Sequence, residues 1–231
     1  MKIDLTEITE SVFEVQTITI CQKFREAAII YLEREPNEID KSKLLKQTDA
    51  LLFKFTLSVI NLEFLWRISE KQSTEGRLAE NEKFEWNNSN SIIDATFFES
   101  TIIQIRAFID FAQKLACVTL GYNKQINGTK DFYKNLNKIG GSKSNLIKEK
   151  FSEMDKTWGK LIRSLRNKIV HYDLIKTNHE YRPTVKGKNY EVFAQELTNN
   201  MFLFLVDLCK LLFEIEWVSG TFNEFKKAYA R

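Results

Sequence analysis

Three residues in the second half of the chain have the types and spacing to bind a phosphate and move a proton. Arg166, Asn167 and His171 lie in the run Arg-Ser-Leu-Arg-Asn-Lys-Ile-Val-His-Tyr-Asp, residues 163–173. Arginine offers a planar fork of donors that matches phosphate oxygens, and asparagine can donate a hydrogen bond to a phosphate or a ribose. Histidine titrates near neutral pH and can act as a general acid or base. These three residues are therefore the first candidates for a catalytic site.

A helix is expected to position this group. At about 100° per residue, the apolar residues of the segment gather on one side, as in an amphipathic helix. That side consists of Trp158, Leu161, Ile162, Leu165, Ile169 and Tyr172. The polar side is predicted to face one outer surface, and its members are Arg163, Arg166, Asn167 and His171. Val170 falls in the middle of the polar side. An apolar residue in a polar surface indicates contact with a partner, and a solvated helix end is the alternative interpretation.

A second polar stripe is predicted on an earlier helix. Arg106 and Asp110 are four residues apart, with Glu99 and Gln113 on the same stripe. One interpretation is an ion pair within the helix, which stabilises it by a few tenths of a kcal/mol. The other is that the stripe faces the helix of His171. In that case Asp110 or Glu99 would orient the histidine or an arginine.

The elements that hold these residues are predicted to be helices. Only 8 glycines and 2 prolines occur in 231 residues, and apolar residues recur at helical spacing. The expected helices cover about residues 8–34, 41–71, 91–120, 152–173 and 191–218, with two short helices on either side of Gly140-Gly141. Segment 72–90 is expected to be a loop, 174–190 a turn or short hairpin, and a short helix is expected after Gly220.

This pattern predicts an all-α protein built as a single helical-bundle domain. An up-and-down bundle is expected over residues 91–231, with the helices of residues 1–90 packing on it. One continuous domain over 1–231 is the alternative. Phenylalanine is abundant, with 18 residues mostly in apolar helical stripes, and is expected to fill the core.

Composition narrows the class of protein. The formal net charge is only +3, which permits nucleic-acid binding without arguing for it. Cys21, Cys117 and Cys209 lie far apart in apolar stretches, which indicates reduced, buried thiols in a cytoplasmic protein. We expect no metal site, because no Cys/His spacing suggests zinc and no carboxylate cluster is apparent. No cofactor, signal peptide or membrane span is expected either.

The segment 124–150 is rich in lysine and contains Phe132 and Tyr133. One interpretation is an ordinary solvated surface. The other is that the lysines guide an RNA backbone while the aromatic residues stack a base.

The run Arg166-Asn167-Lys168-Ile169-Val170-His171 resembles the Arg-x4-His signature of the HEPN superfamily (higher eukaryotes and prokaryotes nucleotide-binding domains). In these compact helical bundles Asn, Asp or His often follows the arginine, as Asn167 does here. The motif lies late in the chain and precedes another apolar helix, so the resemblance covers about residues 91–218. Many toxin-type members have a tyrosine two residues after the histidine, where this chain has Asp173.

The resemblance implies a metal-independent endoribonuclease of bacterial defence or toxin–antitoxin systems, acting in the cytoplasm. The RNA 2′-OH would attack the adjacent phosphorus at a composite site between the two subunits of a homodimer. A cognate antitoxin or a nucleotidyltransferase would be a further partner. The catalytic residues would be Arg166, His171 and Asn167, and the supporting residues Arg163, Asp110, Arg106 and Glu99. Two alternatives stay open: a HEPN-like domain that binds nucleotide, RNA or a partner protein without cleaving, and an unrelated bundle with a chance motif.

Overall fold

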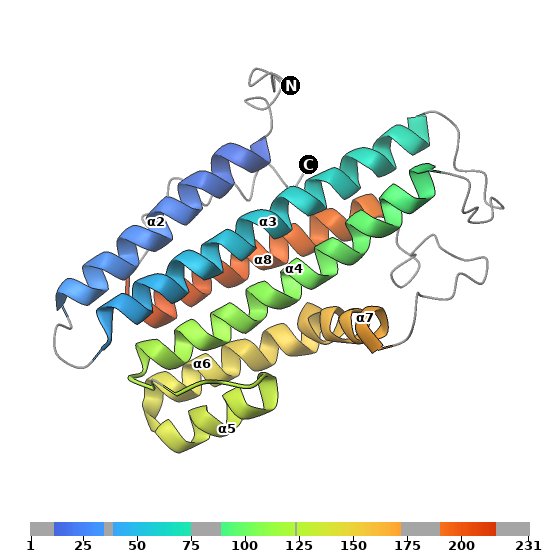
Figure 1. Ribbon diagram of the computed structural model, residues 1–231. Coiled ribbons are helices and arrows are strands. Elements are labelled where there is room, and N and C mark those ends of the chain that lie inside the picture. Colours follow the sequence, from blue (N-terminus) through green and yellow to red (C-terminus); the bar gives the residue numbers. More distant parts are fainter. Residues whose placement is uncertain (1–11, 35–38, 75–88, 123, 172–189, 216–231) are drawn as a thin grey trace.

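The computed structural model of the chain describes residues 12–34, 39–74, 89–122, 124–171 and 190–215. These residues are almost entirely helical, and no β-strand occurs among them. The helices are α2 (Val12–Arg34), α3 (Lys41–Thr74), α4 (Ser89–Thr119), α5 (Thr129–Ile139), α6 (Gly141–Met154), the π-helical turn η1 (Asp155–Gly159), α7 (Lys160–His171) and α8 (Tyr190–Phe213). The all-α class and the single helical bundle expected from the sequence are confirmed (Figure 1).

Apolar spacing predicted the long helices closely. α3 begins at the expected residue, and α4 lies within two residues of its expected bounds. α8 ends at Phe213, five residues earlier than expected, and Glu214 follows with a left-handed φ of 57°. The expected start of the first helix near residue 8 and the expected helix after Gly220 lie outside the described residues. So do most of the segments 72–90 and 174–190.

The core runs between α3, α4 and α8, with α2 along one side. α3 packs along α2, α4 and α8, and Figure 1 shows these helices lying lengthwise beside one another. The ring of Phe55 on α3 lies 4.8 Å from Phe202 on α8 and 5.6 Å from Phe108 on α4. Phe24 on α2 lies 5.3 Å from Phe213 on α8. All five rings are buried, so α2 and α3 share one core with α4 and α8.

Shorter helices form a second group beside α4 and α8. Phe132 on α5 and Phe151 on α6 have ring centroids 4.7 Å apart. Phe204 on α8 lies 5.2 Å from Phe151 and 5.9 Å from Trp158 in η1. α7 in turn packs against α4. Aromatic contacts with α8 therefore fix where the motif-bearing helix α7 lies against α4.

The helix that carries Arg166 does not begin near residue 152, as the sequence suggested. It starts at Gly141 and runs through α6, the π-helical turn η1 and α7 without a break. The break between α5 and α6 lies at Gly140, and both Gly140 and Gly141 have a left-handed φ, of 67° and 83°. Glycine adopts this left-handed backbone at little steric cost, so the predicted division at Gly140-Gly141 is confirmed.

Three expectations from the sequence concern the cysteines, membrane spans and metal sites, and each can be compared with the described residues. The three cysteines are free thiols; Cys117 and Cys209 are buried and Cys21 is half-buried. None of the described helices has the length and apolar character needed to cross a bilayer. Among the described residues, no group of three or more His, Cys, Asp or Glu side chains is placed to hold a metal ion.

Candidate functional site

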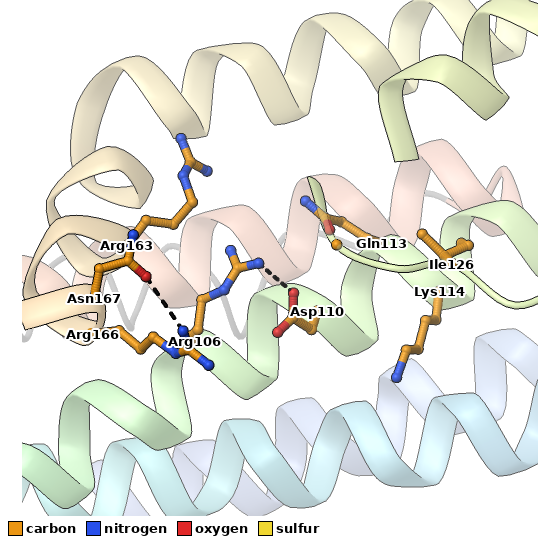
Figure 2. A pocket seen from close by; sticks show the side chains of 9 residues that line it. Arg106, Asp110, Gln113, Lys114, Ile126, Arg163, Arg166 and Asn167 are labelled. Atoms are coloured by element: carbon orange, nitrogen blue, oxygen red, sulfur yellow. Dashed lines mark hydrogen bonds and ion pairs between the residues drawn. The ribbon is translucent and has the colours of Figure 1, made fainter. Parts of the chain in front are cut away.

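A pocket of about 320 Å³ lies between α4, α7 and the segment that leads into α5. Figure 2 shows Arg166 of α7 and Arg106 of α4 both extending into the space between the two helices. The pocket is lined by Arg106, Asp110, Gln113, Lys114, Ile126, Gly128, Arg163, Arg166 and Asn167. The fold thus brings together five side chains that the sequence had proposed, from two helices distant in the chain. Those five are Arg106, Asp110, Arg163, Arg166 and Asn167.

α7 has the predicted apolar side over its described residues. Ile162 is fully buried, and Leu161, Leu165 and Ile169 pack partly buried against the core. Trp158, in the preceding turn, is also buried. The side chain of Tyr172 lies outside the described residues.

The expectation that all the polar residues of α7 face an outer surface is wrong for its arginines. Arg163 and Arg166 are half-buried and line the pocket toward α4, whereas Asn167 is exposed. Arg166 follows the buried Ile162 by four residues, which places it only about 40° away on the helix. The arginine therefore lies at the edge of the apolar side, where the neighbouring helix partly covers it. Its Nη1 donates to Asn167 Oδ1 at 3.3 Å.

His171 is the last residue of α7, one helical turn beyond Asn167. Its side chain and that of Val170 lie outside the described residues. The backbone nevertheless places residue 171 on the same helix as the three pocket residues of α7. The predicted partner contact at Val170 stays a prediction.

The α4 side of the pocket supports both interpretations of the Arg106 stripe. Arg106 Nη2 donates to Asp110 Oδ1 at 2.6 Å, so the ion pair within the helix exists. The same pair lines the pocket opposite α7, so the stripe also faces the motif helix. Glu99 lies half-buried on α4 but is not among the residues that line the pocket. Asp110 therefore orients an arginine of its own helix.

Burial controls the electrostatics of this pair. Desolvation lowers the pKa of Arg106, and the attraction of Asp110 opposes that shift. Desolvation likewise raises the pKa of Asp110, against the pull of Arg106 and Lys114. Burying either charge costs free energy, and the attraction between Arg106 and Asp110 offsets part of that cost. An incoming anion would add a second negatively charged partner for Arg106.

Two buried polar atoms at the pocket lack a partner. Arg106 Nη1 and Gln113 Oε1 make no hydrogen bond within the described structure, although Gln113 is only 1% exposed. Thr129 Oγ1 accepts from Arg106 Nη2 and from Gln113 Nε2, each at 3.3 Å. Arg106 Nη1 is a donor and Gln113 Oε1 is an acceptor. Buried polar atoms without partners are uncommon in proteins, and a bound ion or water is one way in which they are satisfied.

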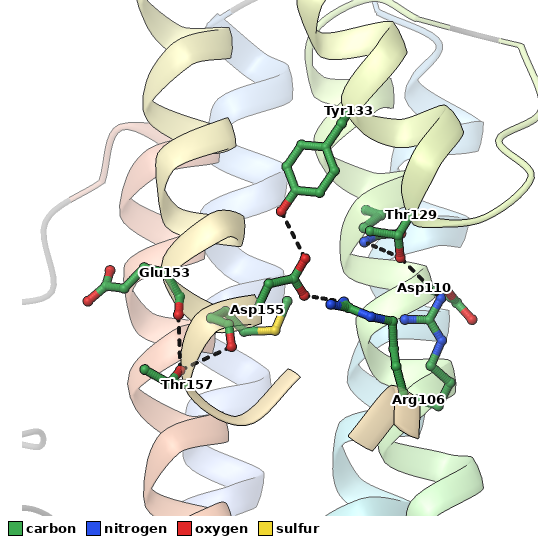
Figure 3. A network of polar contacts seen from close by, with 10 residues as sticks. Arg106, Asp110, Thr129, Tyr133, Glu153, Asp155 and Thr157 are labelled. Carbon is green, nitrogen blue, oxygen red and sulfur yellow. Dashed lines mark hydrogen bonds and ion pairs between the residues drawn. The ribbon is translucent and has the colours of Figure 1, made fainter. Parts of the chain in front are cut away.

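A second polar network, formed by Asp155 and Tyr133, contacts Arg163. Arg163 Nη1 forms an ion pair with Asp155 Oδ1, while the hydroxyl of Tyr133 donates to Asp155 Oδ2 at 3.0 Å. Figure 3 shows Asp155 between Tyr133 and the helix that carries Arg106. Burial, followed by the nearby charge of Asp155, raises the pKa of the Tyr133 phenol well above its usual value, so Tyr133 stays a donor.

Asp155 belongs to the π-helical turn, and Gly159 permits that turn. A methyl group at Gly159 would overlap Met154 Sδ and come within 2.9 Å of Asp155 Oδ1. Thr157 Oγ1 bonds the carbonyl oxygens of Glu153 and Met154, each at 3.0 Å, within the widened turn. Single π-helical turns inside α-helices are rare and occur frequently at functional sites.

The charge balance of the pocket favours an anion. Four cationic side chains and one carboxylate line it. Arg106 is paired with Asp110, and Arg163 is paired with Asp155. Arg166 and Lys114 have no carboxylate partner among the described residues; Lys114 Nζ lies 4.8 Å from the Phe111 ring. Two positive charges therefore remain for a ligand.

Sequence reasoning missed part of the site. Tyr133 gives no local signal, because it contacts Asp155 only through tertiary packing. Asp155 lies eight residues before Arg163 on the same continuous helix, a longer spacing than the one-turn pairs considered from the sequence. Lys114 follows Asp110 by one helical turn, so its spacing would have placed it on the same stripe. Gly128 carries no side chain to suggest a pocket wall.

The idea that Phe132 and Tyr133 stack a base is wrong. Phe132 is fully buried, and Tyr133 is half-buried with its hydroxyl bonded to Asp155. The amphipathic pattern of α5 turns these rings toward the core. Several lysines of the segment are nevertheless exposed.

Comparison with models of protein families, with curated proteins and with solved structures finds no match. The assignment of function therefore depends on the residues and their geometry.

Proposed function

We propose that the chain is a metal-independent endoribonuclease of HEPN type. One observation carries the proposal: Arg166, whose charge no described carboxylate neutralises, lines a cationic pocket on the helix that ends at His171. The resemblance of Arg166-Asn167-Lys168-Ile169-Val170-His171 to the HEPN signature supplies the reaction, and the pocket supplies a place for a phosphate.

The roles follow from the chemistry of the side chains. Arg166 would bind the scissile phosphate and stabilise the additional negative charge of the transition state. His171 would remove the proton of the 2′-OH or protonate the leaving 5′ oxygen. The oxygen of Asn167 accepts from Arg166, which leaves the amide nitrogen to donate to phosphate or ribose. A requirement for the 2′-OH makes RNA the substrate rather than DNA.

Arg106 and Arg163 are proposed to support the phosphate from the other walls. Asp110 holds Arg106 and Asp155 holds Arg163, so both guanidinium groups are oriented before a ligand arrives. Preorganised donors stabilise developing charge without the cost of rearranging at the moment of reaction.

Two copies of the chain are proposed to join their sites in a homodimer, as the resemblance implies. The setting would be bacterial defence or a toxin–antitoxin pair in the cytoplasm, with an antitoxin or a nucleotidyltransferase as partner. Asp173 in place of the toxin-type tyrosine weighs against the toxin subclass and favours the defence setting of the two, without affecting the superfamily resemblance.

The test is incubation of the purified protein with mixed RNAs in EDTA. Cleavage that leaves cyclic phosphate ends is expected, with a loss of about 10²–10⁴-fold in His171→Ala. Arg166→Ala should lose about 10²–10³-fold, and Arg166→Lys most of that, since lysine lacks the fork. His179→Ala, at the one other histidine of the sequence, is the control for His171. Arg25→Ala is the control for Arg166, since Arg25 pairs with Asp49 on helices α2 and α3 and does not line the pocket. Cleavage that survives in both motif variants refutes the site.

A second candidate is a domain that binds nucleotide, RNA or a partner protein without cleaving. The observation that favours it is that the cationic pocket forms within one chain from Arg106, Lys114 and the arginines of α7. On this candidate, RNA or nucleotide binds with affinity that depends on Arg166 and not on His171. No cyclic phosphate product forms.

A further inference from the structure

Three lysines form one stripe along the exposed side of α5. Lys130, Lys134 and Lys138 are spaced by four residues, so they follow one another turn by turn on a single face. All three are exposed. None has an ion pair or hydrogen bond with another described residue. We call these three residues the basic face of α5.

Packing fixes the direction of this face. Phe132, Asn135 and Leu136 are buried on the opposite side of α5. Asn137, beside the stripe, accepts from Lys148 Nζ of α6 at 2.8 Å, which brings a fourth lysine to the edge of the basic face. No apolar side chain interrupts the positions 130, 134 and 138.

Two lysines of α6 differ from the basic face because each has a carboxylate partner. Lys143 pairs with Glu214, and Lys150 pairs with Glu153 and Asp207. The pairs with Asp207 and Glu214 join α6 to α8 and to the residue that follows α8, so these lysines stabilise the packing of α6.

Asp131, the carboxylate of α5, forms no ion pair with the three lysines of the basic face. Asp131 Oδ2 accepts from the backbone N–H of Asn127, at the entry to the helix. The charges of the basic face therefore remain available to a ligand.

α5 itself begins beside the pocket. Gly128 lines the pocket and directly precedes α5. Thr129, the first residue of α5, bonds Arg106 and Gln113 of the pocket wall. From Lys130 to Lys138 the helix rises about 12 Å. A strand that leaves the pocket past Gly128 would meet one lysine per helical turn.

We propose that the basic face of α5 binds the phosphodiester backbone of the RNA strand as it leaves the pocket. This inference depends on the proposed function and deepens it, because it makes the substrate a polynucleotide and excludes a single nucleotide. Lysines are compact point charges that neutralise phosphates without reading a base. The basic face therefore strengthens the binding of longer RNA and adds no preference for base sequence.

The test compares long and short RNA in a triple variant. Lys130, Lys134 and Lys138 are replaced by Gln, and the matched control replaces the exposed Lys23, Lys41 and Lys46 of α2 and α3 by Gln. Binding of an unstructured 20-nucleotide RNA is measured in the non-cleaving His171→Ala background at several salt concentrations. Cleavage of a dinucleotide is measured with His171 intact. Thermal unfolding verifies that both triple variants are folded.

The basic-face variant is expected to bind the long RNA at least tenfold more weakly. Its plot of log affinity against log salt should be less steep by about 2, from three lysines at about 0.7 each. A DNA strand of equal length should lose affinity equally, and dinucleotide cleavage should stay within twofold of the parent. The control variant should match the parent throughout.

Several results overturn the inference. Equal losses in the control variant would show a general charge effect, and an equal loss with the dinucleotide would place the lysines in the pocket chemistry. Weakened binding of polyglutamate with unchanged RNA binding would assign the face to an acidic protein. A parent protein that binds long RNA but cleaves nothing refutes the proposed nuclease alone, because the binding comparison still tests the basic face.

Discussion

Gly159→Ala tests how the π-helical turn holds the pocket. The added methyl would overlap Met154 Sδ and approach Asp155 Oδ1 to 2.9 Å in a buried position. Met154 is 3% exposed, so its side chain has little room to move away. The Asp155 carboxylate must then shift, and it carries the bonds to Arg163 and Tyr133. The change therefore reaches the pocket wall.

The expected loss of stability follows from three contributions. Overpacking of a well-packed core costs about 1–3 kcal/mol. Weakening the hydrogen bonds to the Asp155 carboxylate adds about 1 kcal/mol. Alanine in place of glycine in a helix returns up to about 1 kcal/mol. The net destabilisation is about 2 kcal/mol, which for a chain of this size lowers the melting temperature by about 4–8 °C.

Urea denaturation at neutral pH provides the measurement, with Met154→Ala completing a double-mutant cycle. Met154→Ala alone removes buried volume and should cost about 2–5 kcal/mol. Because it also removes the atom that the new methyl meets, the double variant should be at least about 1 kcal/mol more stable than the sum predicts. Ser164→Ala, at an exposed position of α7, is the control and should stay within about 0.5 kcal/mol of the parent.

Two results would refute this reasoning. If Gly159→Ala is as stable as the parent, the turn tolerates a side chain and the close approach has no energetic consequence. If the two substitutions are strictly additive, the overlap with Met154 is not the origin of the loss.

The other predictions concern single groups. Tyr133→Phe removes the donor to Asp155 and should lower the free energy of unfolding by about 1 kcal/mol, measured by urea denaturation. Burial raises the pKa of Asp110, so the folded protein holds its proton more tightly than the unfolded chain does. This group therefore subtracts stability as pH rises from its ordinary pKa through the raised one, and Asp110→Asn should flatten that part of the stability curve. Burial raises the pKa of Cys117 to about 12, and Cys209 is also buried, so both should react with a thiol reagent only after denaturation.

Each of these has a clear contrary outcome. Tyr133→Phe with unchanged stability would mean that the hydroxyl contributes no net stabilisation. A difference curve between parent and Asp110→Asn that is flat across acid pH would show that burial does not shift this carboxyl. Rapid labelling of three thiols in the native protein would contradict the buried positions of Cys117 and Cys209.

The local sequence determined the long helices and the residues that α7 contributes to the pocket. Helical spacing predicted the starts of α3, α4 and α8 to within two residues and their ends to within five, because an apolar stripe must be buried wherever it occurs. The pair Arg106 and Asp110 was also predictable, since residues four apart meet on any α-helix.

Tertiary structure decided where the two polar stripes lie relative to one another. Packing of Trp158 and Phe151 against Phe204 sets α7 beside α4, and this contact joins residues far apart in the chain. It turned Arg166 from an expected surface residue into a wall of the pocket. Likewise no spacing links Tyr133 to Asp155. Sequence determines which face of each helix is apolar, but which neighbour covers its edge depends on the fit of all side chains at once.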